Sequence, residues 1–173
     1  MVNVRKANEK DIEDIFELYW LSSKEHEAYH PFDKLRKKED CKTVTVRRLK
    51  KELKDDRHVM LVAVNKGKAI GFASGSVGGR DEPDVFEKDI CGFIDEIVVA
   101  TEFRYKGLGT ILLTGLQNRL FRMGAEYIGL AVASMNPAME FYSDNGYNIK
   151  AYWMIKAKPG LKENKKNSQS FFA

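Results

Sequence analysis

Long apolar runs are missing from this sequence of 173 residues. No stretch approaches the ~20 apolar residues with which a helix crosses a bilayer. Residues 1–5 also lack the apolar core of a secretory signal. We therefore expect a soluble, cytoplasmic protein without a membrane partner.

Cysteine is scarce, because the chain holds only Cys41 and Cys91. Neither belongs to a C-x-x-C pair, which argues against a structural metal site. The sequence does not decide whether the two cysteines pair, although a cytosolic chain normally keeps its thiols reduced. We expect no bound metal.

The body of the chain also lacks a large charge of one sign. The formal net charge is +4, and residues 158–173 supply +3 of it with four lysines against one glutamate. A dedicated nucleic-acid binder would carry a basic face on its folded part. We expect one folded domain at residues 1–157 and a disordered basic tail at residues 158–173. A nucleic-acid partner is not favoured.

The spacing of apolar residues predicts a mixed α/β (α+β) fold with the order β-α-α-β-β-β-α-β-α-β. The strands are expected at residues 3–7, 58–64, 69–77, 91–99, 127–132 and 147–155. The helices are expected to follow Asn8 and to cover residues 41–54, 108–123 and 138–144. The second and third strands should form an antiparallel hairpin, and the fourth and fifth should run parallel across a helix.

Local signals support these boundaries. Asn8 and Asp11 have the spacing of a capping box, and Gly124 fits a C-terminal helix cap. The connections at residues 22–40 and 78–89 are long for a compact domain. Long loops are often functional, but a solvated connection explains these two at least as well.

Residues 94–110 join a strand to a helix through the turn Arg104-x-x-Gly107-x-Gly109. The first N–H groups of a helix lack internal partners, and the helix dipole is positive there. Glycine lets the backbone approach a phosphate, while Arg104 and Lys106 add charge. The spacing alone fits a phosphate site and, equally well, a glycine-bearing helix start among solvated charges.

Two segments carry a family resemblance. The first is Ile94-x-x-Ile97-x-Val99 followed by Arg104-x-x-Gly107-x-Gly109. The second is Asn136-Pro137-Ala138-Met139-Glu140-Phe141-Tyr142-x-x-x-Gly146-Tyr147. Together they resemble the acetyl-CoA pyrophosphate loop and the second motif of the GCN5-related N-acetyltransferase family. The resemblance covers residues 1–157 and implies the acyl-CoA N-acyltransferase fold, a mostly antiparallel sheet with one splayed parallel strand pair.

The resemblance implies acetyl-CoA as co-substrate. The backbone of Ile97–Val99 would pair with the pantetheine arm like an added strand, and N–H groups at residues 104–110 would hold the pyrophosphate. Asn136 would cap its helix, bond the pantetheine amide, or do both. The residues expected to bind the cofactor are Ile97, Val98, Val99, Arg104, Tyr105, Lys106, Gly107, Leu108, Gly109, Thr110, Asn136, Ala138 and Tyr142.

The implied reaction is direct attack of a primary amine on the acetyl carbonyl, so the amine must first lose a proton. Asp95 or Glu96 is expected to accept it through water. As neighbours on a strand they should point to opposite faces unless a bulge intervenes, so only one should line the cleft. Tyr142 is the candidate acid for the departing thiolate, and a core aromatic beside Phe141 is the alternative.

The acceptor is the least defined partner. A small-molecule amine and a peptide or protein amine both fit. Tyr29, Phe32, Tyr152 and Trp153 are candidates for lining its pocket, although core packing explains Trp153 equally well. The acidic residues at 81–89 would attract a cation, but a solvated loop is the simpler interpretation. A homodimer agrees with the resemblance, and a non-catalytic acyl-CoA-binding module of the same fold is the alternative function.

Overall fold

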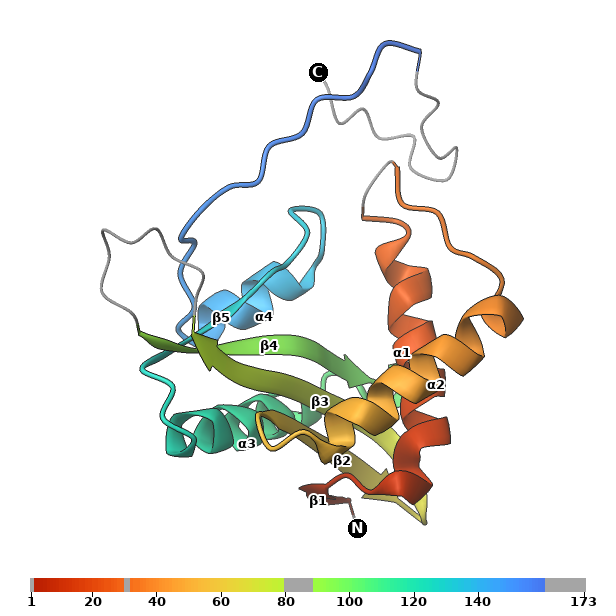
Figure 1. Cartoon of the computed structure of the whole chain (residues 1–173), viewed down its shortest axis with the longest axis vertical. Coiled ribbons are helices and arrows are strands. Elements are labelled where there is room, and N and C mark those ends of the chain that lie inside the picture. Colours follow the sequence, from red (N-terminus) through yellow and green to blue (C-terminus); the bar gives the residue numbers. More distant parts are fainter. Residues whose placement is uncertain (1, 30–31, 80–88, 161–173) are drawn as a thin grey trace. The chain divides into compact units, whose positions relative to one another are not determined.

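The structure, a computed structural model, describes residues 2–29, 32–79 and 89–160 (Figure 1). The chain divides into two compact units. The sheet unit comprises Met1–Ser22 and Lys37–Ala131, and the second unit comprises Ser23–Arg36 and the chain from Val132 onward. Most of the predicted tail, from residue 161, lies outside the described residues.

A mixed sheet forms the centre of the sheet unit. Among the described residues it has five strands in the order β1-β2-β3-β4-β5. These are β1 (Asn3–Lys6), β2 (His58–Asn65), β3 (Lys68–Gly79), β4 (Ile90–Val99) and β5 (Tyr127–Leu130). Neighbours are antiparallel except β4 and β5, which run parallel. The predicted fold class is therefore confirmed.

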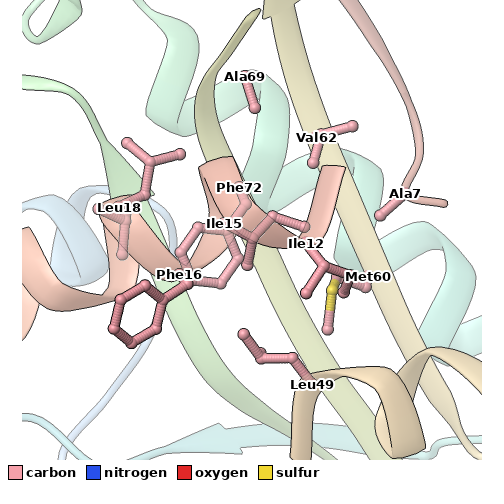
Figure 2. Close-up of a cluster of buried hydrophobic side chains, with 11 residues drawn as sticks. Ala7, Ile12, Ile15, Phe16, Leu18, Leu49, Met60, Val62, Ala69 and Phe72 are labelled. Atoms are coloured by element: carbon pink, nitrogen blue, oxygen red, sulfur yellow. The ribbon is translucent and has the colours of Figure 1, made fainter. Parts of the chain in front are cut away.

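One face of the sheet is covered by α1 (Ile12–His26) and α2 (Lys38–Lys54). Figure 2 shows the cluster of buried apolar side chains on this face. Ile15 and Phe16 of α1, Leu49 of α2 and Phe72 of β3 are all at most 2% exposed. Burying an apolar side chain of this size contributes roughly 1.5–3 kcal/mol, so this cluster fixes both helices to the sheet.

The other face is covered by α3 (Leu108–Arg122), which contacts β2, β3 and β4 (Figure 1). Leu112, Leu116 and Leu120 recur at helical spacing and are fully buried. Gly124 follows the helix with φ +97°, a left-handed conformation that suits the predicted C-terminal cap. The predicted third helix is confirmed.

The predicted start of the first helix is also confirmed. Asn8 Oδ1 accepts a hydrogen bond from the backbone N–H of Lys10, and Asp11 Oδ2 accepts one from the N–H of Asn8. Arg5 adds two hydrogen bonds to the Asp11 carboxylate, at 2.7 and 2.8 Å. The reciprocal cap opens as the 3₁₀ turn Glu9–Asp11, and α1 continues from there.

Two predicted boundaries need correction. α1 extends to His26 and α2 begins at Lys38, so the connection is shorter than the predicted residues 22–40. The polar residues of these end turns suggested a loop, but polar side chains are compatible with a solvent-facing helix. The loop at residues 78–89 lies largely outside the described residues.

The second unit contains α4 (Ala138–Asp144), as predicted. The last strand, predicted at residues 147–155, was wrong, because no strand is assigned in the described chain after α4. Tyr152, Trp153 and Met154 are 81%, 94% and 88% exposed. Alternation of apolar residues suggested a strand, but a strand also needs a partner ladder, which periodicity does not reveal.

Candidate active site

The turn before α3 leaves backbone N–H groups available. Gly107 has φ +76°, and its carbonyl accepts the first intrahelical hydrogen bond from Ile111 N–H at 3.1 Å. The amides of Leu108, Gly109 and Thr110 therefore precede the helical ladder. Within the described chain, no side chain caps this end of α3. A Cβ on Gly107 would meet nothing within 4 Å, so an anion can approach these amides.

The basic residues of the turn brace its backbone. Arg104 Nε donates to the carbonyl of Val99 at 2.9 Å, and Lys106 Nζ donates to the carbonyl of Glu102 at 2.9 Å. Tyr105 has φ +59° and is fully exposed. The sequence predicted added charge at the anion site; in the structure, Arg104 also ties the end of β4 to the turn.

β4 extends beyond the end of its parallel neighbour, β5. The β5 ladder ends where Leu130 pairs with Ile94, while β4 continues to Val99. Its last residues therefore pair with β3 on one side and have no ladder partner from β5 on the other. An extended ligand that adds itself to this edge would meet the open-edge backbone of the stretch Ile97–Val99. This is the segment expected to bind the pantetheine arm.

β4 contains a β-bulge at Asp95, one of the two candidate bases. Ile94 pairs with Gly75 and Glu96 pairs with Ser74, which leaves Asp95 as the extra residue. Only glycine fits opposite, because a Cβ on Gly75 would lie 2.6 Å from the Phe93 carbonyl oxygen. Bulges of this kind redirect side chains. Asp95 and Glu96 therefore need not point to opposite faces of the sheet.

Two charged groups of α2, Arg48 and Glu52, affect the pKa of both Glu96 and Asp95. Burial raises the pKa of Glu96 to about 7, although Arg48 of α2 opposes the rise and Asp95 and Glu52 add to it. Asp95 is the more exposed residue. Partial desolvation of its carboxyl raises its pKa too, with His58 and Arg48 lowering it and Glu52 raising it. A carboxyl that titrates near neutral pH is suited to general-base catalysis.

Arg48 of α2 is exposed but has two partners. Its Nη1 lies 2.7 Å from Glu52 Oε1, and its guanidinium lies 5.1 Å from the centroid of the Tyr19 ring. The sequence analysis did not include Tyr19, Arg48 or Glu52 in the site. The i,i+4 spacing of Arg48 and Glu52 was the signal that could have indicated the ion pair.

In the second unit, Asn136 makes two specific hydrogen bonds. Its Oδ1 accepts from the N–H of Ala138 at 2.9 Å, which confirms its predicted role as a helix cap. Its Nδ2 donates to His26 Nε2 at 3.1 Å. Partial burial lowers the pKa of His26, against smaller opposing effects of Glu25 and Asp33. Local sequence patterns indicated no partner for this histidine, because the two residues are 110 positions apart.

Tyr142 lies on α4 among aromatic rings. Its ring centroid is 5.3 Å from that of Phe141 and 5.8 Å from that of Tyr147, both edge to face. Tyr142 is half-buried. The structure thus brings Asn136, Ala138 and Tyr142 together in the second unit. Asp95, Glu96 and the turn before α3 all belong to the sheet unit.

An apolar hollow of about 290 Å³ adjoins the turn on its β1 side. It is lined by Val2, Val4, Phe103, Lys106, Leu108 and Ile111. Neither Asp95 nor Glu96 contributes to it, so it is separate from the candidate base. Of the residues expected to line an acceptor pocket, Tyr152 and Trp153 are largely exposed.

Further features concern metals and membranes. Cys41 and Cys91 are free thiols. In the described ranges, no group of three or more His, Cys, Asp or Glu side chains is placed to hold a metal ion. No helix in the same ranges has both the length and the apolar character to span a membrane.

Comparison with known sequences identifies a family. The sequence model of the acetyltransferase (GNAT) family matches residues 11–147. None of the curated protein sequences compared matches the chain.

Solved structures share this fold at low sequence identity. A mutant of the BH1408 protein from Bacillus halodurans has a TM-score of 0.81 at 18% identity, covering 90% of this chain and 99% of that chain. AAC(6')-Iy in complex with a CoA bisubstrate analogue has a TM-score of 0.70 at 17% identity, covering 91% and 98%. Glucosamine-6-phosphate N-acetyltransferase from Arabidopsis thaliana has a TM-score of 0.65 at 21% identity, covering 91% and 98%.

Proposed function

The chain belongs to the acetyltransferase (GNAT) family, and from this premise we propose that it transfers the acetyl group of acetyl-CoA to a primary amine. The observation that carries the proposal is the continuity of two binding features in the sheet unit. The open edge of β4 ends at Val99, and residues 100–107 connect it to the uncapped start of α3. An extended arm followed by a diphosphate matches that succession of features.

The residues fit acetyl-CoA. Amides at residues 107–110 would hold the pyrophosphate, with Arg104 and Lys106 keeping the turn in shape. Backbone of the stretch Ile97–Val99 would pair with the pantetheine arm. Acetyl-CoA, when bound, supplies an activated thioester carbonyl. The chain's own contribution is to orient that carbonyl and to move protons.

Glu96 is our first candidate for the base. The acceptor ammonium loses one proton, its N–H electron pair becomes the nitrogen lone pair, and the Glu96 carboxylate gains the proton through water. Support comes from its pKa of about 7, which lets both protonation states exist at neutral pH. Asp95, on the same bulge, is the second candidate.

Tyr142 is our candidate for the acid. The departing thiolate needs a proton, and a neutral phenol can donate one. The half-buried ring among Phe141 and Tyr147 supports a fixed orientation. Asn136 holds the start of the same helix, so we assign it a role in placing Tyr142 and, through its backbone, the cofactor.

For the acceptor we propose a small-molecule primary amine. AAC(6')-Iy was solved with a CoA-acetylneamine analogue, and another protein of the shared fold acts on glucosamine 6-phosphate. Amino sugars are therefore the first compounds to test on this chain, followed by polyamines and peptides.

The test is thiol release from acetyl-CoA across this panel of amines. We expect release with at least one amine, and Tyr142→Phe should lower kcat roughly 100-fold while the Kd for acetyl-CoA changes by less than about twofold. Phe141→Leu on the same helix is the control for packing. Acetyl-CoA binding without thiol release from any amine would instead support the non-catalytic module.

A further inference from the structure

Phe93 is an exposed aromatic residue on an inner strand of the sheet. It lies on β4, which pairs with β3 on one side and with β5 on the other (Figure 1), and it is 43% exposed. A single exposed apolar side chain is common on a protein surface and indicates no site by itself. Phe93 is informative because of the face on which it lies and because of the residues beside it.

The preceding residue, Gly92, identifies that face. A Cβ added to Gly92 would lie 3.4 Å from the Cβ of Leu120 on α3, so position 92 faces α3. Successive side chains of a strand point to opposite faces. Phe93 therefore faces the side of the sheet on which α1 and α2 lie, and it is only partly covered there.

Glu96, the proposed base, lies on the same face. Gly75 of β3 faces α3, because a Cβ added there would lie 3.3 Å from a leucine side chain of that helix. Its neighbours Ser74 and Ser76 therefore face the opposite side. The partner of Ser76 on β4 is Phe93. The partner of Ser74 is Glu96, and cross-strand partners share a face.

The neighbours of Phe93 within the sheet are small. It pairs with Ser76 of β3 and with Gly129 of β5. A Cβ added to Gly129 would lie 3.9 Å from the Phe93 ring, so this position adjoins the ring but has no side chain to cover it. One pair further along, at Ile94 and Leu130, the β4–β5 ladder ends. A ligand that reaches the end of this ladder can therefore pack against the ring.

Phe93 and Glu96 suit different parts of one ligand. A rise of about 3.3 Å per residue separates their Cα atoms by at most about 10 Å. A carboxylate attracts an ammonium group, whereas an aromatic ring packs against an apolar surface. This separation holds a bridging water, an ammonium and the width of one sugar or aryl ring. The sequence of groups is that of an amine attached to a ring, such as an amino sugar, in which the C–H face of the ring is apolar.

We propose that Phe93 is a specificity-determining residue that packs against the carbon ring of the acceptor while the amino group of the acceptor faces Glu96. The acceptor class is then a ring-bearing primary amine, either an amino sugar or an arylalkylamine. This inference rests on the proposed acetyl transfer and narrows its acceptor. Phe93 contacts carbon and C–H groups alone, so it takes no part in proton transfer.

The experiment compares three amines on the wild type and on three variants of the full chain. Glucosamine and benzylamine carry a ring, whereas ethanolamine keeps an amino group and a neighbouring hydroxyl without one. Phe93→Leu removes the flat ring and Phe93→Tyr keeps it. Phe121→Leu makes the same change at a position of α3 that is 49% exposed. The measurements are kcat and KM by thiol release, the Kd for acetyl-CoA, and saturation-transfer NMR of each amine in the presence of coenzyme A.

In the wild type, we expect at least one ring-bearing amine to have a lower KM than ethanolamine. Phe93→Leu should raise that KM roughly fivefold, because the leucine side chain offers no flat face. The kcat, the KM for ethanolamine and the Kd for acetyl-CoA should each stay within about twofold. Phe93→Tyr should restore the KM for the ring-bearing amine, and Phe121→Leu should leave it unchanged.

The inference is overturned if Phe93→Leu raises the KM for ethanolamine as much as that for the ring-bearing amines, or if the wild type prefers ethanolamine. Thiol release would still support the proposed transfer in both cases. NMR identifies the opposite failure. If no amine releases thiol, but saturation transfer to the ring protons is lost in Phe93→Leu and kept in Phe121→Leu, only the proposed transfer is wrong. Absence of both thiol release and saturation transfer contradicts both.

Discussion

Glu96, the base that we propose, also makes folding stability depend on pH. Its pKa is raised from 4.5 to about 7, chiefly by burial, so the folded chain holds this proton more tightly than the unfolded chain does. Below about pH 4.5 the group is protonated in both states and has no effect. As the pH rises towards 7, the unfolded chain ionises first, and stability falls. Above about pH 7 the cost levels off at about 3 kcal/mol.

Glu96→Gln should therefore stabilise the protein only at neutral and alkaline pH. We expect its Tm to match the wild type near about pH 4 and to exceed it by roughly 6–12 °C near about pH 8. The measurement is thermal unfolding followed by circular dichroism across this range. Glu102→Gln, at an exposed position, removes the same charge and should give no pH-dependent difference. A Glu96→Gln difference that is constant with pH would contradict the burial of this carboxyl.

At this scale, sequence reasoning named the two carboxyls but not their arrangement. The bulge depends on Gly75, which lies on a neighbouring strand and permits the close approach of the Phe93 carbonyl. The effect of Arg48 on the pKa of Glu96 joins α2 to β4, which is distant in the chain. Neither relation follows from local spacing, because each needs the register of strand pairs.

At the scale of elements, the N-termini of α3 and α4 differ in how their first backbone N–H groups are capped. α3 begins without a side-chain cap, whereas α4 is capped by Asn136, which also bonds His26. A cap is worth about 1 kcal/mol, so a seven-residue helix such as α4 depends on it. The link to His26 ties this cap to the last turn of α1.

Asn136→Asp tests the link to His26. The aspartate keeps an oxygen for the Ala138 N–H but cannot donate to a neutral imidazole, so it should favour the protonated ring. In the wild type, His26 should titrate below its ordinary pKa of 6.5, and the substitution should raise its pKa by about one unit. The measurement is an NMR titration of the His26 ring.

Asn136→Ser is the matched control, because serine also caps helices but adds no charge. The proposed link would be contradicted if His26 titrated alike in the wild type and in Asn136→Asp.

Most elements could be predicted because their signals are local. The capping box at Asn8, the turn at Asn65–Lys68 and the glycine after α3 each appear within a few residues. The last strand could not be predicted in the same way. Residues 147–155 alternate apolar and polar side chains, yet strand formation is decided by a partner elsewhere in the fold.

At the scale of the whole molecule, the order of elements identified the fold, since strand and helix periodicities differ. The family match over residues 11–147 then confirmed the resemblance that two motifs had indicated. The division into two compact units was not predicted. The boundary at residue 157 and the homodimer stay predictions.

In the mechanism that we propose, the uncapped start of α3 binds the pyrophosphate of coenzyme A. Gly107 and Gly67 provide a matched pair, because each has positive φ (+76° and +82°) and neither has an atom within 4 Å of an added Cβ. An alanine at either position should cost about 1 kcal/mol of stability through backbone strain alone. Only at Gly107 would the new methyl group also face a bound phosphate.

The most direct measurement is calorimetric titration of coenzyme A into the wild type, Gly107→Ala and Gly67→Ala. We predict binding to the wild type, unchanged affinity in Gly67→Ala, and affinity at least about tenfold weaker in Gly107→Ala. Absence of binding to the wild type, or equal affinity in Gly107→Ala and Gly67→Ala, would contradict the claim.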